Sequence, residues 1–322
     1  SSALFDDAKG DGDLTRAQGR KYDYMLDGVD ARPDDHMLEI GCGWGGFAAH
    51  AAKSRGCRVT AVTISPAQYA YASERIQREG LNERVDIRLQ DYRDIEPGSF
   101  DKAASIEMFE AVGERHWPTY FDKLRHALKP GGAASLQIIT IADELFQDYR
   151  RSADYIQKYV FPGGMLPSPT ALSERFRAAS LEFKDAQFFG KDYARTIAEW
   201  NNAFQSAWPR IREMGFDERF RRMWSFYLAY CEGGFAAGSI NVGRFVVQKT
   251  CRAARRRRPI RQRFGCVTDT IAKGMKRNVA HFTSPHRPGR RALRRDPRRC
   301  GALWMWIDEA LGFRRDDPTL PA

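Results

Sequence analysis

The 322-residue chain lacks several features that would assign it to common classes of protein. No apolar run approaches the roughly 18–20 residues of a membrane-spanning helix, and the N-terminus shows no signal-peptide pattern. Its six cysteines include no C-x-x-C pair, and its six histidines form no cluster with metal-ligand spacing. These absences argue against a membrane span, a disulfide framework and a zinc site. They predict reduced thiols, no bound metal and a cytoplasmic location.

The chain also lacks an even distribution of charge. Its formal net charge is +11, but residues 251–322 hold 19 of the 52 lysines and arginines and only 6 of the 41 acidic residues. These last residues therefore carry +13, whereas residues 1–250 carry −2. A nearly neutral body argues against a nucleic-acid-binding surface on it. The arginine runs of residues 251–322, with little periodic apolar content, are typical of a disordered tail.

Three roles for this basic tail stay open. As a basic arm it would attract the protein to anionic phospholipid, with the aromatic residues of 304–307 as an interfacial anchor. As a nucleic-acid-binding segment it would neutralise phosphates. As a fused or misread end it would have no selected function.

The chain does contain a concentrated glycine motif. Residues 37–47 read MLEIGCGWGGF, a short apolar run followed by four glycines within six residues. A strand that turns into a helix through glycines presents backbone N–H groups and lets a ligand approach closely. Gly41, Gly43 and Gly46 fit the dinucleotide pattern G-x-G-x-x-G. Gly41, Gly43 and Gly45 fit the G-x-G-x-G of S-adenosylmethionine (SAM) enzymes.

Strand and helix patterns alternate over the first half of the chain. They predict an α/β protein with a doubly wound, parallel sheet and right-handed crossovers. The rhythm breaks after the fifth strand, where residues 145–215 are rich in aromatics and contain proline–glycine turns. The expected helices span 13–27, 47–54, 66–79 and 116–128, with a helix-like pattern through 220–230. The expected strands span 37–40, 58–64, 85–89, 103–108, 134–139 and 243–249.

The choice of cofactor depends on the residues after strands two and three. A dinucleotide site normally has an acid at the end of strand two, but that position here offers Thr63 and then Gln68. Glu39 instead stands at the end of strand one, where methyltransferases often hold an acid. Asp91 suits the exocyclic amine of adenine, and Tyr92 suits its ring face. The alternative is that Asp91 only forms a turn and that Tyr92 is an aromatic residue on the surface. Together with the glycines, these positions favour SAM.

Further blocks follow in a fixed order. They are IGCGWGG (40–46), VTIS (62–65), LQDYRD (89–94), MFEAVG (108–113), FPGGMLPS (161–168), FGKDYARTIAEW (189–200) and FYLAYCEGGF (226–235). Through these blocks, residues 1 to about 249 resemble the cyclopropane-fatty-acyl-phospholipid synthase and mycolic acid cyclopropane synthase family. The resemblance implies a methyltransferase domain over residues 1–250 with a Rossmann-like class I fold. Its seven-stranded, mostly parallel sheet would carry a helical lid at 145–215.

The resemblance also implies a reaction. The methyl group of SAM would pass to the double bond of a lipid acyl chain, and a bound bicarbonate ion would deprotonate the resulting carbocation so that a cyclopropane closes. Because an alkene is a poor nucleophile, it must be held in a water-free cavity, for which the aromatic lid is the expected cover. The substrate would be an unsaturated phospholipid or a carrier-bound acyl chain, met at the inner face of the membrane. No specific nucleic acid is expected, and a homodimer is allowed.

The family's functional residues carry over by position. Glu110 and Tyr193 would hold the bicarbonate, Ile139 would contact it through the backbone, and Ser2 stands where the family usually has Cys. Cys231 matches a cysteine proposed as catalytic, although a packed small hydrophobe fits it as well. Each of the two main residues also has a structural alternative: Glu110 would suit the cap of the helix after strand four, and Tyr193 would suit a position in the core. The expected cofactor contacts are Ser1, Glu39, Gly41, Cys42, Gly43, Trp44, Gly45, Thr63, Gln68, Asp91 and Tyr92.

Two departures from the family pattern bear on the product. Gln137 stands where the family has the histidine of the bicarbonate site, and Ala111 follows Glu110 in place of another histidine. Glutamine donates a hydrogen bond but cannot carry positive charge or shuttle a proton. Methyl transfer is therefore a firmer expectation than ring closure, and a methylated alkene or a methyl branch is the alternative product. The rival functions are methylation of a small polar acceptor and nucleic-acid binding with a vestigial cofactor site.

Overall fold

The computed structural model describes residues 1–6 and 13–250. The predictions made for the basic tail, which include its disorder and its lipid anchor, lie outside these residues. Three cysteines fall within them, and Cys42, Cys57 and Cys231 are all buried free thiols. Among the described helices, none is both long enough and apolar enough to cross a membrane.

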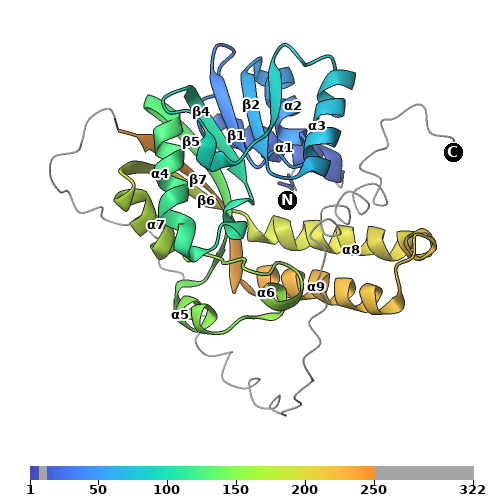
Figure 1. Ribbon diagram of the computed structural model, residues 1–322. Helices are drawn as coiled ribbons and strands as arrows, with labels where there is room; N and C mark the ends of the chain where they lie inside the picture. Colours follow the sequence, from blue (N-terminus) through green and yellow to red (C-terminus); the bar gives the residue numbers. More distant parts are fainter. Residues whose placement is uncertain (7–12, 251–322) are drawn as a thin grey trace.

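A seven-stranded sheet forms the centre of the protein (Figure 1). Its strand order is β3-β2-β1-β4-β5-β7-β6. The first five strands are parallel, and β7 runs antiparallel between β5 and β6. This confirms the predicted fold class. The bounds are β1 (His36–Ile40), β2 (Arg58–Thr63), β3 (Val85–Leu89), β4 (Phe100–Ile106), β5 (Leu128–Ile141), β6 (Leu181–Phe188) and β7 (Ile240–Lys249).

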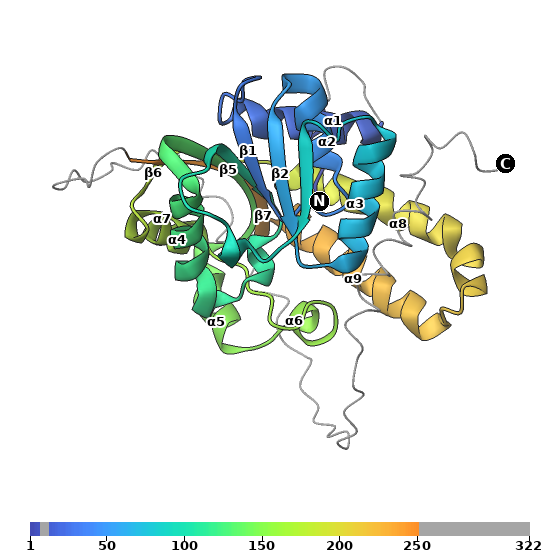
Figure 2. The same cartoon turned by 45° about the horizontal axis from the view of Figure 1, so that its top comes forward.

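Helices cover both faces of the sheet because successive strand residues point to opposite sides. In β1, Met37 packs in one buried cluster with the first three helices, and Leu38 packs in another with α4 and α7. The remaining helices lie beyond one end of the sheet (Figures 1 and 2). The bounds are α1 (Leu14–Asp27), α2 (Gly46–Arg55), α3 (Pro66–Arg78), α4 (Trp117–Ala127), α5 (Asp143–Arg151), α6 (Tyr155–Tyr159), α7 (Pro169–Ala178), α8 (Gly190–Glu213) and α9 (Glu218–Ala237).

The segment expected to be a helical lid, residues 145–215, is not helical throughout. It contains the strand β6, which the sequence patterns did not predict, and the helix α7, which packs on the sheet. The cover beyond the sheet has two parts, α5 with α6 and the antiparallel pair α8 and α9, and α6 packs against α9 (Figures 1 and 2). The second part extends past residue 215, because α9 ends at Ala237.

The α8–α9 pair is fixed to the sheet at the start of α8. The Phe189 N–H donates to the Val242 carbonyl at 2.9 Å, and the Gly190 N–H donates to Asn241 Oδ1 at 2.9 Å. A Cβ atom at Gly190 would lie 2.5 Å from that Oδ1, so only glycine allows this close approach. Aromatic and aliphatic side chains of both helices form a third buried cluster together with Val242 of β7.

Candidate active site

The glycine turn between β1 and α2 has the backbone that its sequence predicts. Gly41, Gly43 and Gly45 have φ angles of 85°, 51° and 77°. Such left-handed conformations are costly for residues with a Cβ atom. Apart from its chain neighbours, no described atom lies within 4 Å of a Cβ built on Gly43. The turn therefore exposes its backbone to a ligand at the N-terminus of a helix, which fits the polar groups of SAM.

Glu39 supports this turn from beneath. Its side chain is 2% exposed and accepts a hydrogen bond from the Ala48 N–H in the first turn of α2. Burial raises the pKa of Glu39 well above its usual value, against the opposing effect of Lys21. Lys21 is itself buried, and burial lowers its pKa to about 8. Glu39 thus supports the glycine turn through the Ala48 N–H, while its Oε2 is buried without a hydrogen-bond partner among the described residues and its contact with SAM stays a prediction.

The other expected cofactor residues form local networks near the turn. Thr63 Oγ1 donates to Gln68 Oε1 at 2.8 Å, just after β2. Asp91 begins the short helix η2 (Tyr92–Asp94), and its carboxylate accepts two hydrogen bonds from the guanidinium of Arg93. That pairing lowers the pKa of Asp91. The ring of Tyr92 packs edge-on against Tyr120, with 5.6 Å between centroids.

Two further residues of the expected cofactor set flank the glycines. Cys42 is buried, and burial raises the pKa of its thiol. The ring of Trp44 meets Tyr71 edge-on at a centroid distance of 5.5 Å. Contacts of these residues with SAM stay predictions.

The chain leaves β4 earlier than expected, and a strained residue follows. The strand ends at Ile106, and Glu107 has a φ of 51°. A left-handed backbone at a non-glycine residue costs on the order of 1–3 kcal/mol and persists only where the surroundings impose it. The next residue, Met108, contacts the glycine turn so closely that a Cβ on Gly41 would lie 2.8 Å from its Cγ. The turns after β1 and β4 therefore meet at the point where the strand order reverses, which is where α/β sheets bind ligands.

The Glu107 carboxylate is the centre of a cluster that the sequence did not reveal. Its Oε1 accepts from the Ser2 N–H at 2.9 Å and from Gln137 Nε2 at 2.7 Å. Its Oε2 accepts from the Tyr193 hydroxyl at 2.6 Å. The side chain is 13% exposed. The sequence signal for Glu107 was its place as an acid directly at the carboxyl end of strand four, but the block MFEAVG indicated Glu110 instead.

Glu110 lies beside this carboxylate on the short helix η3 (Phe109–Ala111). Its Oε1 accepts from the Ile139 N–H at 2.6 Å, and its Oε2 is buried without a hydrogen-bond partner among the described residues. Burial, and after it the charge of Glu107, raises the pKa of Glu110 to about 8. At neutral pH Glu110 therefore carries a proton.

The N-terminal residues run into the site between α1 and α8. The Ala3 N–H donates to Thr196 Oγ1 at 3.1 Å, and the Phe5 N–H donates to Asp192 Oδ1 at 2.8 Å. These bonds place the Ser2 amide at Glu107, while the Ser2 hydroxyl donates to the Ala3 carbonyl. Ser1, an expected cofactor contact, accepts a hydrogen bond from Lys21 Nζ through its Oγ.

Five of the residues predicted to be catalytic converge on the two carboxylates through hydrogen bonds. Cys231 lies near them, in the same buried cluster as Tyr193, but among the described residues no hydrogen bond joins it to either carboxylate. Cys231 shares a hydrogen bond with Tyr227, and burial raises the pKa of its thiol to about 12. A thiol that holds its proton at neutral pH is a poor nucleophile, which favours the packed role.

The predicted bicarbonate ion does not fit this arrangement. The phenol of Tyr193, the amide of Gln137 and the N–H of Ser2, which were expected around the ion, all donate to Glu107. The N–H of Ile139 donates to Glu110. Among the described residues, no group of three or more His, Cys, Asp or Glu side chains could hold a metal ion.

The sheet order, the antiparallel β7 and the glycine turn at the switch point define a class I SAM-dependent methyltransferase. Residues 1–245 match the family model described as mycolic acid cyclopropane synthetase, and the chain belongs to this family. The resemblance drawn from the sequence blocks is therefore confirmed.

Individual relatives agree with this assignment. The tuberculostearic acid methyltransferase UfaA1 of Mycobacterium tuberculosis is 41% identical over 231 residues, which cover 71% of this chain and 54% of the relative. The cyclopropane-fatty-acyl-phospholipid synthase of Escherichia coli K12 is 37% identical over 237 residues, or 73% and 59% of the two chains. The crystal structure of mycolic acid cyclopropane synthase CmaA1 with SAH and CTAB superposes with a TM-score of 0.72 at 25% identity, covering 77% of this chain and 89% of that one. The chain thus spans little more than half the length of these two curated relatives.

Proposed function

We propose that the protein methylates the double bond of an unsaturated phospholipid acyl chain and that the resulting carbocation loses a proton to close a cyclopropane ring. When bound, SAM supplies an electrophilic methyl group. The observation that carries the proposal is the contact between Met108 and Gly41, since it joins the glycine turn to the Glu107–Glu110 cluster. A methyl group bound at the glycine turn would therefore lie beside the side chains of Glu107 and Glu110.

The surroundings of the cluster suit a cationic intermediate on a lipid. The ring of Tyr193 packs against Phe235 at a centroid distance of 4.4 Å and meets Trp200 edge-on at 6.0 Å. Aromatic faces attract cations, and a site lined by them excludes water that would capture a carbocation. The α8–α9 pair, which contributes all three rings, acts in this proposal as the wall of the acyl site.

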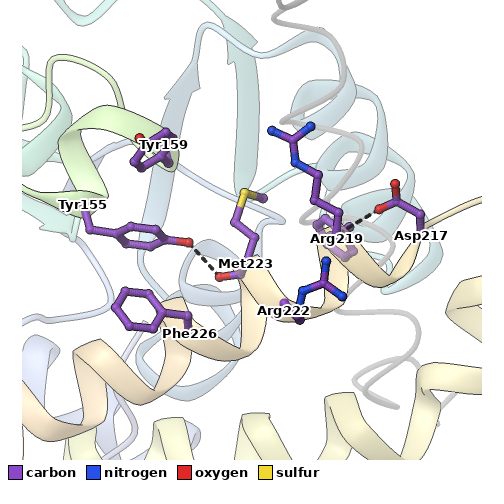
Figure 3. Close-up of a pocket in the computed structure, with 8 residues that line it drawn as sticks. Tyr155, Tyr159, Asp217, Arg219, Arg222, Met223 and Phe226 are labelled. Atoms are coloured by element: carbon purple, nitrogen blue, oxygen red, sulfur yellow. Dashed lines mark hydrogen bonds between the residues drawn. The ribbon is translucent and has the colours of Figure 1, made fainter. Parts of the chain in front are cut away.

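A groove between α6 and α9 supports a phospholipid substrate (Figure 3). Tyr155 and Phe226 lie toward one end of it, and Arg219 and Arg222 lie toward the other. Its volume is about 610 Å³. Aromatic side chains suit acyl chains and the membrane interface, and guanidinium groups bind phosphate. The full lining is Tyr155, Tyr159, Asp217, Arg219, Phe220, Arg222, Met223 and Phe226.

This face also fits peripheral contact with a membrane. Large apolar side chains that are usually buried stand exposed around the groove, and a membrane surface is one partner that would cover them. We propose that the enzyme meets its substrate in the inner leaflet of the membrane through this face. The exposed fractions are 53% for Phe226, 50% for Tyr159, 44% for Tyr230 and 41% for Phe161.

A methylated alkene or a methyl branch is the second candidate product. Gln137 favours it, because a neutral amide replaces the family's histidine within hydrogen-bonding distance of Glu107. Loss of a proton after a hydride shift would leave a carbon–carbon double bond, whereas a saturated branch would require a hydride from a separate reductant such as a reduced nicotinamide cofactor.

One experiment separates these outcomes. The purified protein is incubated with SAM and vesicles of unsaturated phospholipid, and the released fatty acids are analysed by mass spectrometry and proton NMR. A gain of one methylene unit with loss of the olefinic signal supports the cyclopropane. The same gain with an olefinic signal supports the methylated alkene, and two additional hydrogens, in a parallel sample that also contains a reduced nicotinamide cofactor as hydride donor, support the branch. No gain in mass rejects the proposed function.

A further inference from the structure

We propose that the Glu107 carboxylate fills the place that the resemblance assigns to bicarbonate and that it is the base for the carbocation. This inference rests on the proposed methyl transfer. Bicarbonate and a carboxylate each present two oxygens on a planar carbon, so one set of donors can bind either anion. In this protein three of the expected donors already bind Glu107, at 2.6–2.9 Å.

The backbone of Glu107 brings the carboxylate to this position. A residue that continued β4 would point its side chain away from one face of the sheet or the other. The left-handed conformation at Glu107 breaks that alternation directly after Ile106. The donors that meet the side chain come from the N-terminal segment, β5 and α8. The fold therefore gathers three separate parts of the chain around one carboxylate.

The hydrogen bonds to the Glu107 carboxylate leave one of its lone-pair sites free to accept a proton. An ionised carboxylate offers about four lone-pair sites. Oε1 of Glu107 accepts from Ser2 and Gln137. Among the described residues, Oε2 accepts one hydrogen bond, from Tyr193, with the Ser1 nitrogen 4.0 Å away. The side chain keeps 13% of its surface accessible, in contrast to the buried Oε2 of Glu110. Oε2 of Glu107 is therefore the acceptor atom.

The proton transfer balances without another reagent. A C–H bond of the newly added methyl group breaks, and its electron pair forms the bond to the cationic carbon that closes the ring. The proton moves to Oε2 of Glu107 and leaves to solvent before the next turnover. If a hydride shift precedes this step, the same proton transfer gives the methylated alkene, so the role of Glu107 does not depend on the product.

The test compares three variants with the wild type in carbonate-free buffer and in buffer with added bicarbonate. Glu107→Gln keeps the shape without the base, and Glu107→Gly removes the side chain where glycine adopts the backbone readily. Glu144→Gln, on the exposed surface of α5, is the control for loss of one charge. Calorimetric titration with SAM verifies that each variant retains its cofactor site.

We expect wild-type turnover to be the same in both buffers to within about twofold. Glu107→Gln should lose on the order of a hundredfold or more, the usual size of a general-base effect. Glu107→Gly should lose as much in carbonate-free buffer and recover when bicarbonate enters the space that the side chain left. Wild-type turnover that requires bicarbonate, or full turnover by Glu107→Gln, would overturn the assignment.

A binding measurement keeps this inference separate from the proposed function. ¹³C-labelled bicarbonate is titrated into the wild type and Glu107→Gly, each with S-adenosylhomocysteine, and followed by NMR. Binding to the glycine variant alone supports the assignment, even if no lipid is methylated under any condition. Saturable binding to the wild type overturns it, even if lipid is methylated.

Discussion

At the scale of single residues, Glu110 links the site to stability. Burial raises its pKa from 4.5 to about 8 in the folded protein. Between pH 4.5 and about pH 8, Glu110 is ionised in the unfolded chain but still protonated in the folded protein. The stability that Glu110 contributes is therefore complete below about pH 4.5 and is lost as the pH rises to about 8.

We predict that Glu110→Gln removes this pH dependence. The amide keeps an acceptor for the Ile139 N–H but has no proton to lose. From pH 5 to pH 8.5, the free energy of unfolding of the variant should rise relative to the wild type by up to roughly 3–5 kcal/mol. Urea denaturation at both values measures it. A constant difference between variant and wild type would show that Glu110 ionises normally in the folded protein.

Gly43 provides a second prediction at this scale, with Gly80 as its matched control. Both residues have a positive φ, 51° and 67°, and a Cβ on either would meet no described atom within 4 Å beyond its chain neighbours. Substitution by alanine should therefore destabilise each protein by about 1–2 kcal/mol through backbone strain alone. Only Gly43 belongs to the predicted cofactor turn.

We expect Gly43→Ala to weaken SAM binding tenfold or more in calorimetric titration and Gly80→Ala to leave the affinity unchanged. The reason is that a methyl group at Gly43 would fill the space through which the cofactor approaches the backbone. Equal affinities in the two variants would remove Gly43 from the cofactor site.

At the scale of elements, the N-terminal segment depends on α8. Thr196 Oγ1 accepts from the Ala3 N–H and donates to the Asp192 carbonyl one turn earlier. We predict that Thr196→Val costs about 1–2 kcal/mol and lowers turnover about tenfold, because the Ser2 amide then loses its fixed position at Glu107. Ser206→Ala is the control, since Ser206 makes the same bond to the carbonyl one turn earlier without touching the segment. Lipid turnover and urea denaturation are measured for both. Equal effects would mean that the segment is positioned by other contacts.

The elements also show which parts of the fold the sequence reveals. The first strand, its glycine turn and α2 were predicted because glycine spacing and apolar runs are local signals. Ser65 caps α3 as predicted, its Oγ accepting from the Gln68 N–H. The edge strand β6 was missed because only one of its eight residues, Leu181, is fully buried, so the apolar alternation is weak.

The site was harder to predict than the sheet. Glu110, Gln137 and Tyr193 were found by their positions in family-like blocks. Glu107 was not found, since its role depends on partners 30 to 105 positions away and on a left-handed backbone that no local pattern indicates. The expectation of bicarbonate could not take Glu107 into account for the same reason, because three of the donors expected around the ion donate to that side chain.

At the scale of the whole molecule, the net charge of residues 1–250 does not by itself attract the protein to an anionic membrane. Residues 1–250 carry a net charge of −2, so attraction of the body to anionic lipid must come from local clusters. Arg219 and Arg222 form such a cluster beside the exposed rings of α6 and α9. Each basic residue near an anionic bilayer contributes about 1 kcal/mol.

We therefore predict that replacing both Arg219 and Arg222 with alanine weakens binding of the full chain to anionic phospholipid vesicles by roughly tenfold to thirtyfold at physiological salt. The matched control replaces Arg78 and Arg177, two exposed arginines on α3 and α7, and removes the same charge from other faces. Vesicle sedimentation measures binding, and methylation of detergent-dispersed lipid shows whether the active site is intact. The first variant should lose vesicle binding and keep turnover on dispersed lipid, because the groove delivers the substrate and the Glu107 cluster transforms it. If both variants lose the same affinity, the attraction follows total charge, and the α6–α9 face has no special part in meeting the membrane.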